Sequence, residues 1–286
     1  MKAISTNKLT KKYGDTIGIT DLNLSVDDGD FFGFIGPNGA GKSTTIRTLL
    51  GLIAPTSGSA KIFDMDIVKE HDKILKNIGY LPSEINFYNK MTVKDTIAFS
   101  AGLRKNDCSK KAEELCERLN LDTGKKVDEL SLGNRKKAGI VCAIQHRPKL
   151  LILDEPTSGL DPLMQKEFFK ILSEENENGT TVFLSSHILS EVQSYCKTAA
   201  FIKGGKIIVS DKVEKLEETG AKKISFSGNL DTNGLKGVSE LHKADTITSF
   251  LYTGNIKTLL KLMSESDIKD LTITEPSLEE IFMNYY

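Results

Sequence analysis

The stretch Gly36-Pro37-Asn38-Gly39-Ala40-Gly41-Lys42-Ser43 decides the fold that we expect for this chain. Gly36 and Gly41, followed by a lysine and a hydroxyl residue, match the pattern G-x-x-x-x-G-K-[ST] of a phosphate-binding loop. An apolar run at residues 31–35 precedes the stretch, and residues 43–50 after it carry Ile46 and Leu49 at helical spacing. The motif requires a strand, a loop and a helix in this order, and the sequence predicts all three. The alternative to a phosphate-binding loop is an ordinary glycine-rich turn between a strand and a helix.

The chemistry of this stretch predicts a site for phosphate groups and Mg²⁺. Glycines let the loop curl, so that successive N–H groups and the N-terminus of the helix point at phosphate oxygens. The Lys42 ammonium is expected to neutralise the β- and γ-phosphates, and the Ser43 hydroxyl to ligate Mg²⁺. The sequence therefore predicts a nucleotide site at the start of this helix.

Two carboxylates follow a second apolar run, at residues 150–153. Asp154 and Glu155 would lie at the C-terminal end of a buried strand, the edge at which parallel sheets bind ligands. We expect Asp154 to hold Mg²⁺ through its water shell, and Glu155 to take a proton from an attacking water. A strand that ends in Asp-Glu can also be a solvated turn, but the phosphate loop in the same chain favours the catalytic pair.

Composition and charge exclude several classes of protein. The 286 residues are 39% hydrophobic, 27% charged and 7% aromatic, and the formal net charge is −1, which disfavours a basic nucleic-acid-binding protein. No apolar run approaches the roughly 18 residues that cross a bilayer, and the polar residues 1–8 predict no secretory signal. The cysteines at 108, 116, 142 and 196 form no C-x-x-C pair. We therefore expect a cytoplasmic protein without a cysteine metal site.

Patterns along the chain predict an α/β domain over residues 1–218. Short apolar or alternating segments at 4–9, 22–26 and 31–35 make its beginning β-rich, and residues 91–147 predict a helical insert that starts with a capping box at 92–95. Strands are then expected at 150–153 and 180–185, helices at 162–176 and 188–195, and a hairpin over 199–209. Alternating units with buried strands imply a mostly parallel sheet.

Residues 219–286 are predicted to form a small α+β domain. It follows a charged helix at 212–218. Short strands are expected at 224–227, 246–252 and 271–274, and helices at 256–263 and 277–284.

Five motifs occur in one order along the chain. The run 128–137 places Ser131 at the cap of a helix whose free N–H groups can receive an anion, with a plain helix start as the alternative. The five are the loop 36–43, this Leu-Ser-x-Gly run, the Asp154-Glu155 strand end, Ser158-Gly159-Leu160-Asp161, and Ser186-His187. Over residues 3–218 the chain therefore resembles the ATP-binding subunit of an ABC transporter.

The resemblance implies a P-loop NTPase fold of the ABC type and a role for each motif. It implies that ATP contacts Tyr13, Gly36, Pro37, Asn38, Gly39, Ala40, Gly41, Lys42, Ser43, Thr44, Ser131, Gly133 and Asp161. Glu155, His187 and Lys42 correspond to the catalytic residues, and Ser43 and Asp154 to the Mg²⁺ ligands. Taken alone, Tyr13 would be a packing or surface aromatic, and His187 a histidine satisfied at a strand end.

Three positions depart from the family pattern. The family has glutamine where this chain has Ser83 followed by Glu84, so Ser83 is a doubtful Mg²⁺ contact. Leu132 replaces the first glycine of the signature and Asn134 its glutamine. Ser131 and the backbone N–H groups remain, so we expect anion binding to persist and the energy of closure to differ.

Residues 80–91 and 275–282 resemble the bacterial branch that exports drugs, antimicrobial peptides or other amphipathic peptides. This implies an ATPase that uses ATP and Mg²⁺, pairs head to tail with a copy of itself or a paralogue, and drives a separate membrane subunit from the cytoplasmic side of the membrane. The groove at 83–91 and the helical insert are expected to touch that subunit. The C-terminal domain is either regulatory or a packing module that stabilises a dimer.

Two other functions stay open from the sequence. One is a soluble ABC ATPase that acts on ribosomes or nucleic acid. This fits less well, because ribosomal members carry two ATPase cassettes in one chain and DNA-repair members contain long coiled coils, whereas this sequence has one phosphate loop and no such coiled coil. The other is a nucleotide-dependent regulator without substantial turnover, which the serine at position 83 keeps open.

Overall fold

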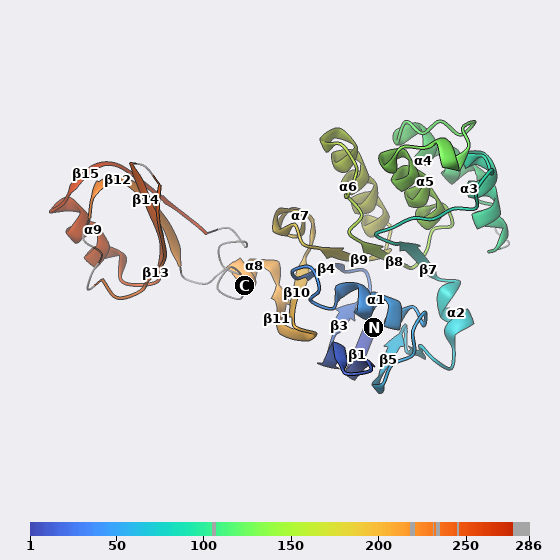
Figure 1. The fold of residues 1–286 in the computed structure, drawn as a ribbon, viewed down its shortest axis with the longest axis horizontal. Helices are drawn as coiled ribbons and strands as arrows, with labels where there is room; N and C mark the ends of the chain where they lie inside the picture. The colour runs from blue at the N-terminus through green and yellow to red at the C-terminus, as the bar shows by residue number, and fades with distance from the viewer. Residues whose placement is uncertain (105–106, 218–220, 231, 233–234, 245, 277–286) are drawn as a thin grey trace. The chain divides into compact units, whose positions relative to one another are not determined.

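The chain divides into two compact units, Met1–Asp211 and Lys212–Tyr286 (Figure 1). The structure is a computed structural model that describes residues 1–104, 107–217, 221–230, 232, 235–244 and 246–276. The predicted domain boundary after residue 218 and the predicted helix at 277–284 involve residues outside these ranges. Both stay predictions, and the two units are described separately below.

A six-stranded sheet forms the centre of the first unit. Its order is β11-β10-β4-β9-β8-β7, and every pair from β10 to β7 is parallel. The strands are β4 (Phe31–Ile35), β7 (Ile78–Leu81), β8 (Leu150–Asp154), β9 (Thr181–Ser186), β10 (Thr198–Lys203) and β11 (Lys206–Lys212). Every residue of β4, β8 and β9 is buried, as expected for parallel strands covered on both faces.

An antiparallel sheet and helix α1 (Lys42–Leu49) cover one face of the parallel sheet. This second sheet has the order β2-β1-β5-β6, with β3 paired to β1. Its strands are β1 (Lys2–Tyr13), β2 (Thr16–Leu22), β3 (Ser25–Asp27), β5 (Ser57–Ile62) and β6 (Met65–Asp66), and the short helix α2 (His71–Leu75) follows them. Figure 1 shows three helices on the other face of the parallel sheet: α5 (Leu132–Ile144), α6 (Pro162–Glu177) and α7 (Leu189–Tyr195).

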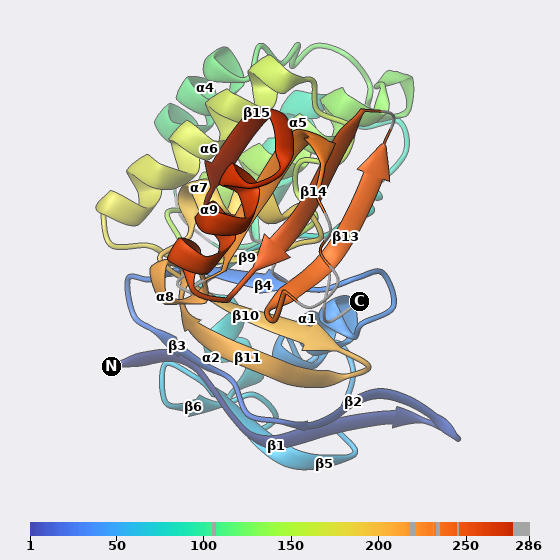
Figure 2. The same ribbon diagram turned by 90° about the vertical axis from the view of Figure 1, so that its left-hand side faces the viewer.

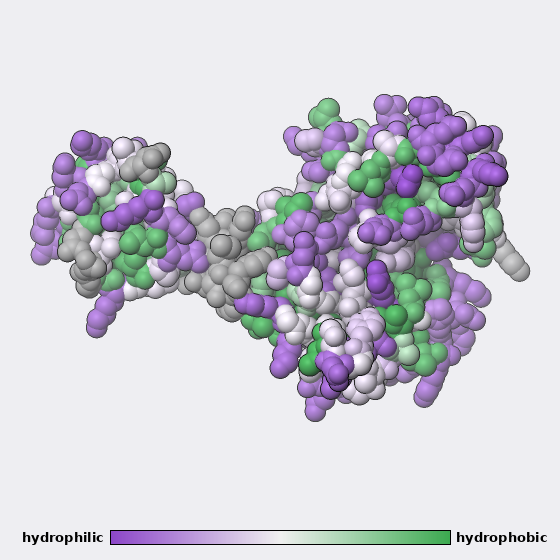
Figure 3. All heavy atoms as spheres, viewed as in Figure 1, coloured by the Kyte–Doolittle hydropathy of each residue, from purple (hydrophilic) through white to green (hydrophobic). Residues whose placement is uncertain are grey.

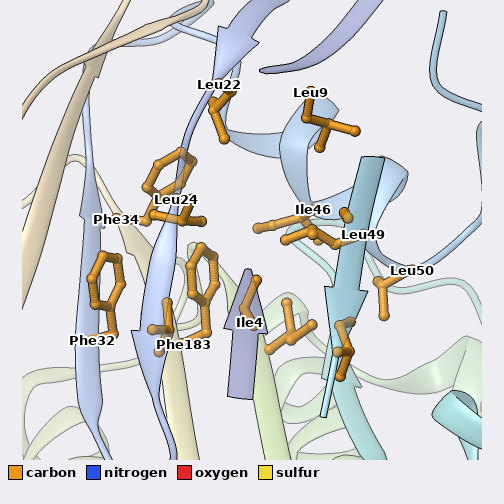
Figure 4. Packing of buried hydrophobic residues seen from close by; sticks show 14 of the residues in the cluster. Ile4, Leu9, Leu22, Leu24, Phe32, Phe34, Ile46, Leu49, Leu50 and Phe183 are labelled. Carbon is orange, nitrogen blue, oxygen red and sulfur yellow. The ribbon is translucent and has the colours of Figure 1, made fainter. Parts of the chain in front are cut away.

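The main hydrophobic core lies between the two sheets and fixes α1. Figure 4 shows Ile46 and Leu49 of α1 beside Ile4 of β1 and Phe183 of β9. The Phe32 and Phe183 rings stack with their centroids 5.6 Å apart and an interplanar angle of 7°. Because α1 begins directly after the phosphate loop, this core also determines where the loop lies.

The helical insert consists of α3 (Val93–Gly102), α4 (Ser109–Arg118), a 3₁₀ turn (Val127–Glu129) and α5 (Leu132–Ile144). The predicted cap at Thr92 is confirmed, since Asp95 N–H donates to Thr92 Oγ1 over 3.0 Å at the start of α3, while the Asp95 carboxylate accepts from Thr92 Oγ1 over 2.6 Å. Arg118 of α4 forms ion pairs with Glu167 and Glu174 of α6 (Pro162–Glu177), which join the insert to the parallel-sheet layer. Figure 3 shows mainly hydrophilic side chains on the visible face of the insert.

The second unit is an antiparallel sheet with one helix packed against it (Figure 2). After α8 (Val213–Glu217) come β12 (Lys222–Asn229), β13 (Val238–Ala244), β14 (Ile247–Tyr252), α9 (Ile256–Ser264) and β15 (Asp267–Thr274), and the sheet order is β13-β14-β12-β15. Leu259 and Met263 of α9 pack with Phe226 and Phe250 of the strands. Strand β13 was not predicted, because most of its side chains are exposed and show no apolar alternation.

The predicted fold class is confirmed. The first unit has the β-rich beginning, the helical insert and the mostly parallel sheet that the sequence indicates, and the second unit is a small α+β domain. The last helix of the parallel layer, α7 (Leu189–Tyr195), also lies where the pattern places it. None of the described helices is long and apolar enough to cross a bilayer.

His146, just after α5, makes the stability of the fold depend on pH. Its Nε2 lies 3.1 Å from Ile78 O, and burial together with the nearby Arg104 guanidinium lowers the pKa of His146 to about 4. Between pH 6.5 and about 4 the unfolded chain therefore binds a proton that the folded chain does not, so the free energy of unfolding falls as the pH is lowered through this window.

We predict that His146→Gln, whose amide can still donate to Ile78 O, removes this part of the pH dependence. Urea unfolding of both proteins at pH 7.5, 6 and 5 measures it, and between pH 7.5 and 5 the free energy of unfolding should fall more for the wild type than for the variant. A constant difference between the two proteins at all three pH values would contradict the assignment.

Candidate functional site

The phosphate-binding loop connects β4 to α1 across residues 36–41. Gly41, the residue before α1, has a φ of +109°, and a Cβ atom there would lie 2.7 Å from Gly18 O. Only glycine takes this backbone conformation and this close approach without strain. The predicted strand–loop–helix arrangement is therefore present, with the helix starting at Lys42.

The loop offers a set of free hydrogen-bond donors. Within the described chain, the backbone N–H groups of Gly39 and of residues 41–44 have no hydrogen-bond partner, and no acidic residue lies in the first turn of α1. The Lys42 side chain is buried against the loop, where its Nζ donates to Gly36 O over 2.6 Å and to Pro37 O over 3.2 Å. Free N–H groups, a lysine and a helix N-terminus together fit a bound polyphosphate.

Tyr13 lies beside this loop. It ends β1, and its ring is 46% exposed, with Lys11 Nζ 5.2 Å from the ring centroid. A Cβ atom at Gly18 would lie 3.1 Å from the Tyr13 ring and 2.9 Å from Thr44 Cγ2, so both side chains flank the same glycine. An exposed ring next to the end of the phosphate loop is a suitable surface for a base to stack on.

Asp154, the last residue of β8, is 1% exposed. Ser185 of β9, its partner across the sheet, donates from Oγ to Asp154 Oδ1 over 3.1 Å and so orients the carboxylate. Ser185 was not predicted from the sequence. Its signal is a hydroxyl residue that directly follows the apolar run Val182–Leu184 of the strand.

Three predicted catalytic residues meet around the carboxylate of Glu155. Glu155 Oε1 lies 3.4 Å from Lys42 Nζ, and Glu155 Oε2 lies 3.1 Å from His187 Nδ1. The backbone of Glu155 is left-handed, with a φ of +48°, and its N–H donates to Ser185 O over 3.0 Å. Glu155 and His187 also line a pocket of about 210 Å³ with Ser158. A carboxylate held in this way can accept a proton from a water molecule.

The turn that carries His187 is held by side chains. Ser186 Oγ donates to Glu191 Oε2 over 2.6 Å, and Ile188 N–H donates to Ser186 Oγ over 2.9 Å. These bonds fix the residues on both sides of His187. Its ring is therefore placed by the end of β9 and the start of α7.

The signature residues lie at the start of α5. Ser131 is the N-cap, as predicted, and its Oγ accepts from Asn134 N–H over 3.3 Å. A Cβ atom at Gly133 would lie 2.7 Å from Gly159 O, so glycine there lets α5 approach the loop that ends at Asp161. The Asp161 carboxylate caps α6 by accepting from two N–H groups at 3.0 Å.

The structure does not bring the signature and the phosphate loop together. Figures 1 and 2 show α5 and α1 on different sides of the parallel sheet. Ser131 caps α5 and Gly133 lies in its first turn, whereas Lys42 begins α1. A site that uses both motifs therefore needs two chains.

Lys136 of α5 is a second residue that was not predicted from the sequence. Its Nζ donates to the backbone oxygens of Ser83 and Glu155, and its side chain is buried. Burial lowers the pKa of Lys136, while the carboxylates of Asp154 and Glu155 act in the opposite direction. A lysine on the apolar face of a predicted helix is the signal that could have identified it.

Comparison with known proteins points to one family. A family model described as ABC transporter matches residues 19–158. The chain is 36% identical to the bacitracin transport ATP-binding protein BcrA of Bacillus licheniformis, over 98% of this chain and 96% of that protein. It is 30% identical to the linearmycin resistance ATP-binding protein LnrL of Bacillus subtilis strain 168, over 98% and 97%. A solved ATP-binding subunit of an ABC transporter matches with a TM-score of 0.72 and 26% identity, over 75% of this chain and 92% of that one.

Lys42→Ala tests the phosphate loop. The substitution removes the only side-chain cation of the loop, and the remaining donors are neutral N–H groups. We predict that binding of a fluorescent ATP analogue weakens by at least about tenfold, as expected for the loss of a charge-assisted contact. Equilibrium titration measures this, with Lys12→Ala, a lysine outside the loop, as the control. Equal affinity in both variants and the wild type would remove the assignment.

Proposed function

Because this chain belongs to the ABC transporter family as an ATP-binding protein, we propose that it binds and hydrolyses ATP to power a separate membrane subunit that exports drugs or amphipathic peptides. One observation carries the proposal: the Glu155 carboxylate contacts both Lys42 and His187, beside a loop with free N–H donors. The bacitracin and linearmycin relatives, matched over nearly their whole length, support the class of exported molecule.

In the proposed reaction a water oxygen attacks the γ-phosphorus of ATP, and the bond from that phosphorus to the ADP oxygen breaks. The Glu155 carboxylate accepts the proton that the water loses, and His187 holds that carboxylate through Nδ1. Lys42 and the N–H groups of residues 39–44 offset the negative charge on the β- and γ-phosphates. Mg²⁺, which Ser43 Oγ and Asp154 would hold, supplies further charge neutralisation when bound.

A head-to-tail dimer is part of the proposal. The signature of one chain would close on the phosphate loop of a second copy or of a paralogue. The separation of α5 from α1 supports this arrangement, as does the exposure of the signature residue Leu132, which is 65% exposed. An exposed leucine next to Ser131 suits a surface that becomes buried when the second chain docks.

The membrane subunit is proposed to dock on the loop at 83–91 and on α3, at the cytoplasmic side of the membrane. Tyr88, 70% exposed, and Phe99 form an edge-to-face pair with centroids 5.8 Å apart. Leu103, just after α3, is also exposed. These large apolar side chains in one segment of a mainly hydrophilic insert support an interaction surface.

Glu155→Gln separates ATP binding from hydrolysis. The amide keeps the size and hydrogen-bonding capacity of the side chain but cannot act as a base. We predict that turnover falls by about 100-fold or more while ATP still binds, so that closed dimers accumulate. Size-exclusion chromatography with ATP and Mg²⁺ measures the dimers. The control is Glu113→Gln, which makes the same change at an exposed residue outside the site. A Glu155→Gln variant that hydrolyses ATP normally would show that Glu155 is not the base.

Ser83→Gln tests whether the 83–91 loop couples the two subunits. The family glutamine is absent here, so we predict slow turnover by the isolated chain and faster turnover with the membrane subunit, because the partner sets the position of this loop. ATPase rates are compared for wild type and Ser83→Gln, each alone and with the partner in lipid. Equal rates in all four samples would show that the 83–91 loop does not couple the two subunits, and the helical insert would then be the proposed coupling element.

A further inference from the structure

Lys136 is a buried cation close to the proposed catalytic centre, and the proposed function gives it no role. It lies in the second turn of α5, on the face that also carries the buried residues Ile140 and Ala143. Its side chain is only 2% exposed. An ammonium in such a place is costly unless all of its protons find acceptors, so its contacts need an explanation.

The acceptors are backbone oxygens from two different strand ends. Lys136 Nζ donates to Ser83 O over 2.9 Å, to Glu155 O over 3.3 Å and to Pro82 O over 3.4 Å. An ammonium has three protons, and three carbonyl oxygens are present. The two segments follow β7 and β8, which are neighbours in the parallel sheet. One ammonium therefore ties the loop after β7 to the residue after β8.

This contact acts on a strained part of the backbone. Glu155 is left-handed, a conformation that is unfavourable for a non-glycine residue and persists only where the surroundings impose it. Ser185 O fixes its N–H and Lys136 Nζ contacts its C=O. Between these two bonds lies the Cα atom from which the carboxylate reaches Lys42 and His187. The direction of that carboxylate therefore depends on both bonds.

We propose that Lys136 is a positioning residue that links the 82–84 loop to Glu155, so that the position of the loop determines whether the carboxylate is placed for hydrolysis. The inference rests on the proposed function as an ATPase. Within the described residues, the hydrogen bonds of Lys136 Nζ all go to backbone carbonyl oxygens. In a chain with serine in place of the family glutamine, this ammonium supplies a direct connection between the loop and the catalytic carboxylate.

Lys136→Met tests the link, because methionine keeps most of the length of the side chain and removes the ammonium. Lys137→Met is the matched control, since Lys137 is the next residue of the same helix and its side chain has no hydrogen bond or ion pair within the described residues. We expect kcat of Lys136→Met to fall by about 10- to 100-fold, the size of effect that misplacement of a reacting group produces. KM for ATP and the affinity for a fluorescent ATP analogue should stay within about twofold of wild type.

Unchanged kcat in Lys136→Met, or a fall in kcat matched by an equal loss of ATP affinity, would overturn the proposal. If Lys136→Met does not fold, Lys136→Gln replaces it, and wild-type kcat in that variant would likewise overturn the proposal. Partial recovery of kcat in Lys136→Arg, which restores the charge and the donors, would support the link. The proposed ATPase function fails separately, if wild type shows no turnover or if Glu155→Gln leaves turnover unchanged.

Discussion

The site depends on one geometric constraint, the adjacency of three parallel strands in register. Ile35 of β4 pairs with Ser186 of β9, and Asp154 of β8 pairs with Ser185. The phosphate loop, the Glu155 carboxylate and His187 therefore leave the sheet at the same edge, although they are far apart in sequence. A shift of one residue in any of these strands would turn its side chains to the other face and separate the three groups.

Hydrophobic packing stabilises this edge of the sheet, although the edge includes the strained backbone of Glu155. Burying an aliphatic side chain completely contributes about 1.5–3 kcal/mol, and α1 alone buries both Ile46 and Leu49 between the sheets. The left-handed backbone of Glu155 costs of order 1–3 kcal/mol, and the buried Asp154 and Lys136 need bonded partners. The apolar strands therefore form a rigid support on which a few strained or charged residues can be kept.

Features that depend on neighbouring residues in the chain were predictable from the sequence. The phosphate loop, the Ser131 cap and the Thr92 cap each follow from a short pattern and a known local conformation. Ser185 and Lys136 escaped prediction because their partners are distant in sequence: Lys136 contacts Ser83 only after α5 packs against β7. Strand β13 escaped because its side chains are too exposed to show alternation.

The polar contacts that join the helical insert to the rest of the unit differ in their response to solvent. The ion pairs from Arg118 to Glu167 and Glu174 are partly exposed, so salt partly screens them. Lys136, in contrast, is shielded from solvent and bonded to backbone atoms. A displacement of α5 would change those bonds directly, at a place where no water can replace them. The buried link is therefore a contact through which movement of the insert would affect Glu155 directly.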